Sequence, residues 1–412
     1  MNYFIKNIHI NKLFHLENID IPIADEKYPH LIITGKNGSG KTVLLNAIAD
    51  FLNTIKNDKN KDFLTYKEKL SYWQEELAVP PTIHDEILAG IQVDDYKKLV
   101  NDLFGKVDVS LYSTNIIEKH GEGKFILAFY QASRIISMIE PKNPTKPQYS
   151  KNGNIKEYAT SQFLNFLSDL KIQEALARNE KQFDDADEIN AWFVDFEKLL
   201  QQIYQDKNLK LEFNYKDYSF KIFTEGKKFK FTELSDGFAA ALDIVADLIL
   251  KMQNDNSLTR IYQKEGIVLI DEIETHLHLG LQKIIMPLLT KVFPNIQFIV
   301  TTHSPFILNS MENAVAYDLE HREPIEDLSN YSYEALAEGY FGVSTESSTV
   351  EMRLNRLREL LEQEERTDAE KNEIRILITE LDKISEAVSP DLVGEYISLK
   401  SDHVDIIKEI GL

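Results

Sequence analysis

The sequence of 412 residues contains no cysteine, which excludes disulfide bonds and thiolate metal sites. It also lacks any stretch of about eighteen uninterrupted apolar residues, the length that a membrane-spanning helix needs. Residues 1–10 carry Lys6, His9 and two asparagines in place of the apolar run of an export signal. We therefore expect a cytoplasmic protein without a membrane partner, folded into two or three domains at about 150 residues per domain.

Basic residues are scarce relative to acidic ones, with 46 Lys and Arg against 67 Asp and Glu and a net charge of −21. This balance disfavours a whole-surface attraction to nucleic acid or to anionic lipid, because both are negatively charged themselves. A local basic patch can still bind nucleic acid, so that partner stays open. A protein or nucleotide partner agrees better with the composition.

Residues 31–42, LIITGKNGSGKT, combine an apolar, β-branched strand with a glycine-rich phosphate loop, or P-loop. The apolar spacing after the loop predicts a helix over 43–51. Backbone N–H groups of such a loop, together with the positive end of the helix, bind phosphate oxygens, whereas a glycine-rich turn that matches by chance is the alternative. In the pattern, Lys41 reaches the β- and γ-phosphates and the Thr42 hydroxyl binds magnesium. The expected phosphate-binding residues are Gly35, Lys36, Asn37, Gly38, Ser39, Gly40, Lys41, Thr42 and Val43.

Residues 4–13 and 19–23 alternate apolar and polar side chains, which predicts two half-buried strands ahead of the P-loop strand. Phe14 and His15 fall in the turn between these strands. Packing is the favoured role for both rings, and stacking of a ring on an adenine is the alternative. Further along the chain strands alternate with helices, which indicates a mainly parallel sheet.

Residues 266–270 form a continuous apolar run that ends in Asp271 and Glu272. In P-loop NTPases a carboxylate at the end of such a strand lies beside the P-loop magnesium, and a second one polarises the attacking water. A solvated strand end is the alternative for an acidic pair taken alone. Because a P-loop precedes the pair, we expect Asp271 to hold the metal and Glu272 to act as the general base.

The motifs GKNGSGKT, Gln131, LSDGF (234–238), VLIDE, THLH (275–278) and TTHSP occur in the order that resembles the ABC-type ATPases. The resemblance implies that Gln131 is the Q-loop residue, which contacts magnesium and water, and that His303 is the switch histidine. The set also implies that the signature residues Ser235, Asp236 and Gly237 bind the γ-phosphate held by the P-loop of another subunit. A head-to-tail dimer around two ATP molecules follows from this arrangement.

Asp236, Phe238 and His278 depart from the glycine, glutamine and aspartate that many relatives carry. The variants LSDGF and DEIETHLH resemble the branch with the OLD-type, RecF-like and defence-island ATPases rather than transporter subunits. His276 and His278 have the spacing of a metal site, but hydrogen bonding within a D-loop is the favoured interpretation. For Arg134, a charge near the phosphates and a surface ion pair are equally open.

The resemblance implies an α/β fold: an ABC-type P-loop NTPase with a mainly parallel sheet, an antiparallel β subdomain, a helical insertion lobe and a C-terminal helical hairpin over 351–386. The six expected segments are the N-terminal core with the P-loop (1–51), a helical insertion (52–104), core strands with the Q-loop (105–140), a loop and helical lobe (141–206), the C-terminal core with the remaining motifs (207–310), and a helical region for oligomer or partner contacts (311–412).

The motif set and the lack of a recognisable nuclease segment after residue 310 suggest an ATP- and Mg²⁺-dependent ATPase that regulates a separate effector. That effector would be a nuclease or toxin encoded nearby, as in the Septu, PARIS and retron-associated systems of anti-phage defence that this dialect resembles. A homodimer or higher oligomer is expected. The alternatives are a RecF-like DNA-repair clamp and a nucleotide-dependent scaffold with little turnover.

Overall fold

The computed structural model describes residues 5–23, 30–57, 65–79, 82–112, 115–134, 138–145, 155–253, 264–325, 331, 333, 335–336, 348–363, 365–383 and 390–411. The chain divides into two compact units, residues 1–333 and 334–412, and each is treated by itself. Within the described residues, no helix combines the length and the apolar character that crossing a membrane requires.

A six-stranded sheet forms the centre of the first unit, in the order β12-β11-β3-β10-β9-β5. Five strands are parallel, and only β12 runs antiparallel to its neighbour β11. The inner strands are buried on both faces, which explains their continuous apolar sequences. The six strands are β3 (His30–Thr34), β5 (Phe125–Tyr130), β9 (Glu265–Ile270), β10 (Ile296–Thr301), β11 (Ala314–Asp318) and β12 (Glu323–Ile325).

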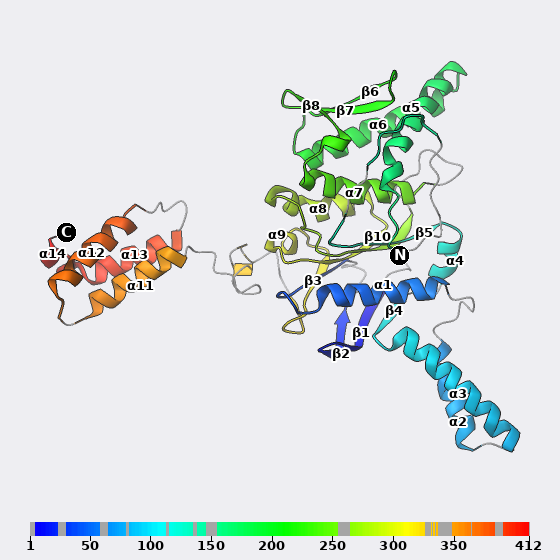
Figure 1. The fold of residues 1–412 in the computed structure, drawn as a ribbon, viewed down its shortest axis with the longest axis horizontal. Helices are drawn as coiled ribbons and strands as arrows, with labels where there is room; N and C mark the ends of the chain where they lie inside the picture. The colour runs from blue at the N-terminus through cyan, green and yellow to red at the C-terminus, as the bar shows by residue number, and fades with distance from the viewer. Residues whose placement is uncertain are drawn as a thin grey trace. The chain divides into compact units, whose positions relative to one another are not determined.

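A second, antiparallel sheet has the order β2-β1-β4, with β1 at Ile5–Leu13, β2 at Leu16–Pro22 and β4 at Val107–Leu111. Alternate residues of β1 and β2 are buried, as the alternating sequence predicts. Helix α1 (Lys41–Asn57) lies between this sheet and the six-stranded one (Figure 1). One apolar core joins the two sheets through α1, so the P-loop at the start of α1 is fixed from both sides.

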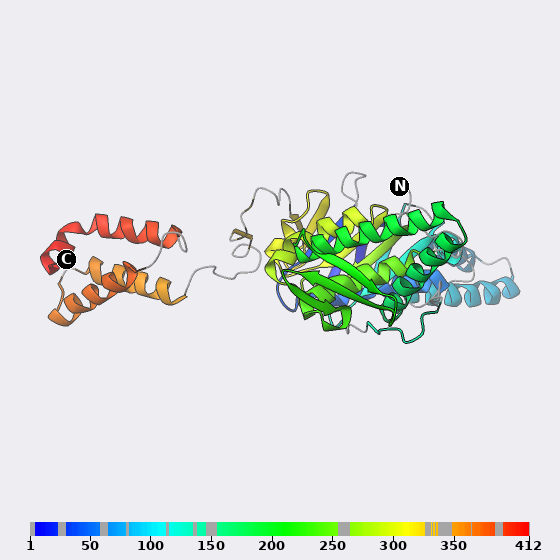
Figure 2. The same cartoon turned by 90° about the horizontal axis from the view of Figure 1, so that it is seen from above.

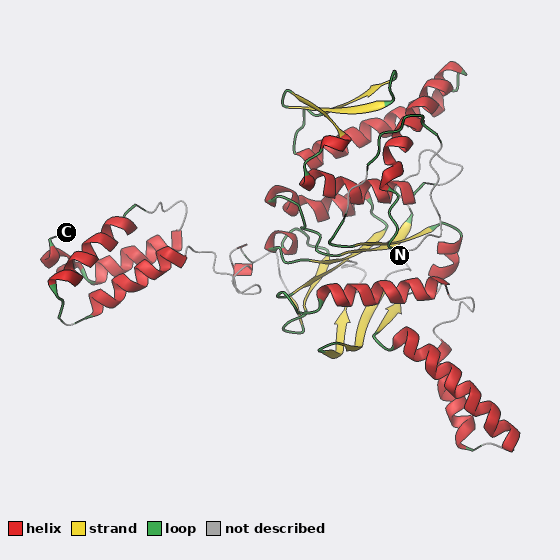
Figure 3. Ribbon diagram, in the orientation of Figure 1, coloured by secondary structure: helices red, strands yellow, loops and turns green. Residues whose placement is uncertain are grey.

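Two helices, α7 (Asp236–Lys251) and α8 (Leu279–Val292), cover the other face of the large sheet (Figures 1 and 2). A lobe outside them combines two long helices with a three-stranded antiparallel sheet, as the sequence predicts (Figure 3). Its elements are α5 (Phe163–Asn179), α6 (Phe183–Tyr204), β6 (Lys210–Asn214), β7 (Ser219–Thr224) and β8 (Lys227–Lys230). The short helices α4 (Ile116–Gly121) and α9 (Pro305–Leu308) connect strands of the core.

The expected insertion after α1 is a pair of helices, α2 (Tyr66–Ala78) and α3 (Ile83–Phe104). The predicted break at Pro80-Pro81 falls outside the described residues. Leu103 and Phe104 at the end of α3 are buried against the core, and Figure 1 shows the pair projecting from the side of the core where β4 lies.

Two expectations about the C-terminal part are wrong. The core does not end at residue 310, because the strands β11 and β12 extend the large sheet beside β3. The second unit is also larger than a two-helix hairpin: it holds α11 (Ser348–Glu362), α12 (Asp368–Leu381), α13 (Pro390–Asp402) and α14 (Val404–Ile410). Leu392, Tyr396 and Leu399 on α13 join the apolar core of α11 and α12, so the expected hairpin is half of a small bundle.

Candidate functional site

The P-loop follows β3 and turns through three glycines with positive φ: Gly35 at 131°, Gly38 at 87° and Gly40 at 101°. Larger residues adopt this backbone rarely. A Cβ atom on Gly40 would lie 2.9 Å from Leu16 Cδ1, and one on Gly35 would lie 2.9 Å from Ser39 Oγ. Glycine is therefore required at both places, for conformation and for space.

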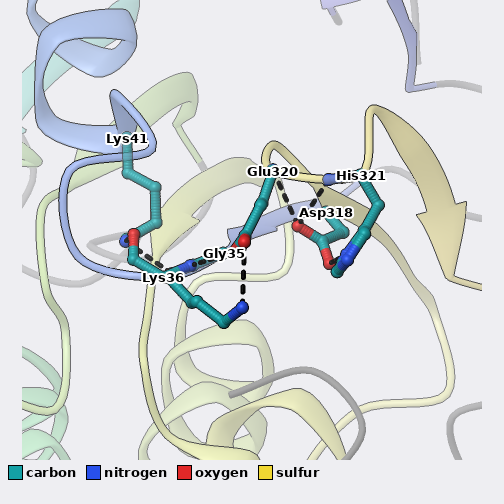
Figure 4. A network of polar contacts seen from close by, with 6 residues as sticks. All are labelled: Gly35, Lys36, Lys41, Asp318, Glu320 and His321. Carbon is teal, nitrogen blue, oxygen red and sulfur yellow. Dashed lines mark hydrogen bonds and ion pairs between the residues drawn. The ribbon is translucent and has the colours of Figure 1, made fainter. Parts of the chain in front are cut away.

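Lys41 is buried beneath this loop, and its Nζ donates hydrogen bonds to the carbonyl oxygens of Gly35 at 2.7 Å and Lys36 at 3.1 Å (Figure 4). Burial lowers the pKa of Lys41, while the nearby carboxylates, Glu272 first among them, raise it. The buried Ser39 hydroxyl has no hydrogen-bond partner among the described residues. An ammonium group and a donor hydroxyl turned into one glycine loop fit the oxygens of a triphosphate.

The turn after β11 packs on the P-loop, a contact that the sequence interpretation missed by ending the core at 310. Glu320 accepts hydrogen bonds from the Lys36 backbone N–H at 3.2 Å and from the Lys36 ammonium at 3.0 Å. Asp318, buried beside Gly35, accepts from Glu320 N–H at 2.8 Å and is paired with His321 (Figure 4). The short apolar run AVAY before Asp318 was the only signal for this strand.

Thr42 and Asp271 lie together, as the sequence predicts. The Thr42 hydroxyl donates to Asp271 Oδ1 at 3.2 Å, and the Thr301 hydroxyl donates to the same oxygen at 2.6 Å. Asp271 itself is buried. A hydroxyl and a carboxylate at the P-loop are the oxygen ligands that Mg²⁺ takes in nucleotide sites, so these residues fit the expected metal.

Glu272 has a left-handed backbone, with φ at +44°, and its N–H donates to Thr301 Oγ1 at 2.8 Å. Arg134 stabilises this turn, because its guanidinium donates to the backbone carbonyls of residues 271, 272 and 273 at 3.4 to 3.5 Å. Burial lowers the pKa of Arg134. Both expectations for Arg134 are therefore wrong, since it is a buried clamp on the backbone that carries Glu272.

His303 follows β10, and Glu274 connects it to the turn after β9. The Glu274 carboxylate accepts hydrogen bonds from the Thr302 hydroxyl at 2.8 Å and from the His303 backbone N–H. Burial raises the pKa of Glu274. Burial, and then the charge of Lys41, lowers the pKa of His303 below 6.5, so the imidazole is neutral at pH 7.

We expect Glu274→Gln to lower the turnover number for ATP about tenfold, with the ATP dissociation constant changed less than about twofold. The amide loses charge-assisted hydrogen bonds to Thr302 and His303, which contribute about 1.5–3 kcal/mol each, but it leaves the P-loop intact. Steady-state turnover and nucleotide titration measure the two effects. Glu265→Gln, which removes an ion pair with Lys119 at the far end of β9, is the control. Unchanged turnover in Glu274→Gln would remove Glu274 from the positioning of His303.

Gln131 comes directly after β5, next to Asp271. The Asp271 N–H donates to the Tyr130 carbonyl at 2.8 Å, and the Gln131 N–H donates to the Tyr158 hydroxyl at 3.0 Å. The Tyr130 hydroxyl in turn donates to Asp247 on α7 at 2.7 Å. The Q-loop is thus hydrogen-bonded to the helix that begins at the signature turn.

The signature turn Ser235–Gly237 begins α7 and leaves the side chains of Ser235 and Asp236 exposed. A Cβ on Gly237 would lie 2.7 Å from the His276 carbonyl oxygen, so the signature and the D-loop of one chain are in close contact. Phe238 stacks on Tyr204 with ring centroids 4.1 Å apart and meets the edge of His278 at 5.4 Å. The unusual phenylalanine therefore packs the helical lobe against the D-loop.

His278 uses one ring nitrogen to begin α8, because its Nδ1 accepts a hydrogen bond from Leu281 N–H at 3.3 Å. Phe14 was expected to be a packing residue, and that expectation is wrong, since the ring is 79% exposed in a turn with φ at +55°. His15 is exposed as well. This turn lies against the P-loop, because a Cβ on Gly40 would be 3.7 Å from His15 Cε1.

Comparison with known proteins gives one family match and several curated relatives. Residues 140–309 match the family described as "AAA domain, putative AbiEii toxin, Type IV TA system". The Septu protein PtuA of Bacillus mycoides (strain KBAB4) is 26% identical over 333 residues, which are 78% of this chain and 41% of that protein. The Retron Ec83 probable ATPase of Escherichia coli is 46% identical over 83 residues, 20% of this chain and 15% of that protein. The chain thus spans less than half the length of these curated relatives.

Among solved structures, the Smc head bound to the C-terminal winged-helix domain of ScpA aligns with 78% of this chain and 96% of its own, at a TM-score of 0.35 and 15% identity. The Pyrococcus furiosus Smc head with an extended coiled coil, bound to the C-terminal domain of ScpA, aligns at a TM-score of 0.34 and 13% identity.

Proposed function

We propose that this chain, which has the fold of an ABC-type P-loop ATPase and is similar to Septu and retron ATPases, hydrolyses ATP to control a separate effector protein in anti-phage defence. The observation that carries the ATPase part is one cluster. It brings Lys41 of the P-loop, the Thr42–Asp271 pair and Glu272 to the same edge of the parallel sheet. Nucleotides bind at this edge in open α/β sheets.

In the proposed reaction the P-loop amides and Lys41 bind the triphosphate. Thr42 and Asp271 would hold Mg²⁺, which supplies positive charge against the phosphate oxygens when bound. Glu272 accepts the proton of the water that attacks the γ-phosphate, and the side chain of Gln131 orients that water. The neutral His303 ring donates a hydrogen bond to a γ-phosphate oxygen, on a backbone that Glu274 fixes.

The proposed active form is a head-to-tail dimer, in which the signature turn of one copy completes the nucleotide site of the other. The exposed Ser235 and Asp236 side chains support this form, because a helix N-terminus with free polar groups suits the γ-phosphate of a second copy. The motif order of the ABC-type ATPases supports it as well.

Ser235→Arg is expected to bind ATP with the affinity of the wild type and to lose at least about tenfold in turnover, because the larger cation blocks the closed dimer. A fluorescent ATP analogue measures binding, and sedimentation in a Glu272→Gln background measures dimer formation. The exposed Ser71→Arg on α2 is the control. Weakened ATP binding by the monomeric Ser235→Arg variant would place the serine in its own nucleotide site and contradict the dimer.

The defence role is tested by expressing the chain together with its neighbouring genes and measuring phage plating efficiency. Protection that requires both Glu272 and the adjacent gene product supports an ATPase that controls an effector. The alternative, a RecF-like DNA clamp, predicts hydrolysis that DNA stimulates and that salt suppresses steeply. The net charge of −21 favours the effector-controlling ATPase over the clamp.

A further inference from the structure

The distal half of the α2–α3 hairpin exposes an apolar surface (Figures 1 and 3). Ile83, Ile87 and Ile91 recur every four residues on α3, and they are 78%, 60% and 54% exposed. That spacing places the three side chains along one face of the helix. Val79, just before α3, is 82% exposed and adds to the same end of the hairpin. We name residues 79–95 the hairpin tip.

The exposed isoleucines are not needed to hold the hairpin together. Its internal packing uses a different face of α3, where Ala89 is buried and Tyr96 lies against Tyr66 with ring centroids 6.3 Å apart. The base of α3 is anchored to the core by Leu103 and Phe104. A row of large apolar side chains that serves neither contact marks an interaction surface.

The charge around the tip selects the kind of partner. Residues 70–96 contain six carboxylates and neither Lys nor Arg. Asp94 and Asp95 follow Ile91 by three and four residues, so they continue the apolar row on the same face. The six acidic residues are Glu75, Glu76, Asp85, Glu86, Asp94 and Asp95.

This charge disfavours three occupants. Nucleic acid and anionic lipid are repelled by a surface without a cation. The same tip of a second copy would bring six carboxylates against six, which costs free energy through like-charge repulsion. A partner that buries the isoleucines must instead carry positive charge at the rim of its own apolar face.

We propose that the hairpin tip is a docking site for another protein, which inserts an amphipathic helix with an apolar face flanked by Lys and Arg. The isoleucines supply the buried centre of the interface, and the carboxylates supply its charged rim. The proposal is independent of the assigned ATPase chemistry, because the tip holds none of the nucleotide-site residues.

The test uses the full chain and a synthetic amphipathic Leu/Lys peptide of about fifteen residues, labelled for fluorescence anisotropy. A peptide of the same composition, scrambled so that it has no apolar face, controls for charge alone. We expect the double variant Ile87→Ser/Ile91→Ser to bind the amphipathic peptide at least about tenfold more weakly than the wild type. Ile139→Ser, at an exposed isoleucine of a core loop, should bind it normally. The ATP turnover of all variants should stay unchanged.

Equal binding of the scrambled and amphipathic peptides, or equal binding by the double variant and the wild type, would overturn the proposal. A Leu/Glu peptide that binds as tightly as the Leu/Lys peptide would overturn the charge assignment. Self-association of the wild type that Ile87→Ser/Ile91→Ser abolishes in sedimentation would identify a second copy as the occupant and also overturn it.

Discussion

Glu272→Gln is expected to lower the ATP turnover number at least about a hundredfold, equivalent to about 2.7 kcal/mol of activation free energy, while ATP stays bound. The substitution removes the carboxylate that takes the proton of water and keeps the size of the side chain. The backbone should not move, because Thr301 accepts from the residue 272 N–H and Arg134 binds the carbonyls around it. The variant should therefore accumulate as an ATP-loaded dimer.

Single-turnover hydrolysis and filter binding separate the two effects, since the first measures chemistry and the second measures retained nucleotide. Glu118→Gln, an exposed residue of α4, controls for the loss of one negative charge. Hydrolysis at the wild-type rate in Glu272→Gln would assign the base to another group, and Glu274 would then be the next carboxylate to test.

Lys41→Ala is expected to weaken ATP binding at least about a hundredfold, equivalent to about 2.7 kcal/mol of binding free energy. The variant loses the cation that meets the β- and γ-phosphates, and also the two hydrogen bonds that close the loop onto the Gly35 and Lys36 carbonyls. Calorimetric titration measures the affinity. The wild type should gain thermal stability from ATP, and the variant should gain none.

Lys36→Ala is the contrast on the same loop. The Lys36 side chain is half exposed and paired with Glu320, so its removal should weaken ATP binding only slightly. If Lys36→Ala lost as much affinity as Lys41→Ala, the binding role would belong to the loop conformation and not to the Lys41 ammonium.

Local patterns in the sequence were sufficient for the elements that carry chemistry. The P-loop and the strand ending at Asp271 depend on short runs of glycine or apolar residues, and the structure has both within a residue or two of their expected bounds. The pairing of Thr42 with Asp271 could be expected because the carboxyl ends of parallel strands share one edge of the sheet.

The residues that support this chemistry could not be predicted, because their contacts join distant parts of the chain. Arg134 binds carbonyls that follow 137 to 139 residues later, and Glu320 binds Lys36 across 284 residues. Neither contact leaves a periodic signal. Phe14 was misjudged for a local reason, since a two-residue turn with positive φ directs its ring into solvent.

The position of β3 in the sheet has a consequence for how the chain is made. Leu31 pairs with Ile299 on one side and Val315 on the other. A ribosome that adds roughly 5–20 residues per second needs roughly 15–55 s to synthesise the roughly 270 residues in between. During that interval the strand that precedes the P-loop has neither of its neighbours, so the nascent chain depends on chaperones or on the earlier β1–β2 hairpin to keep it from aggregating.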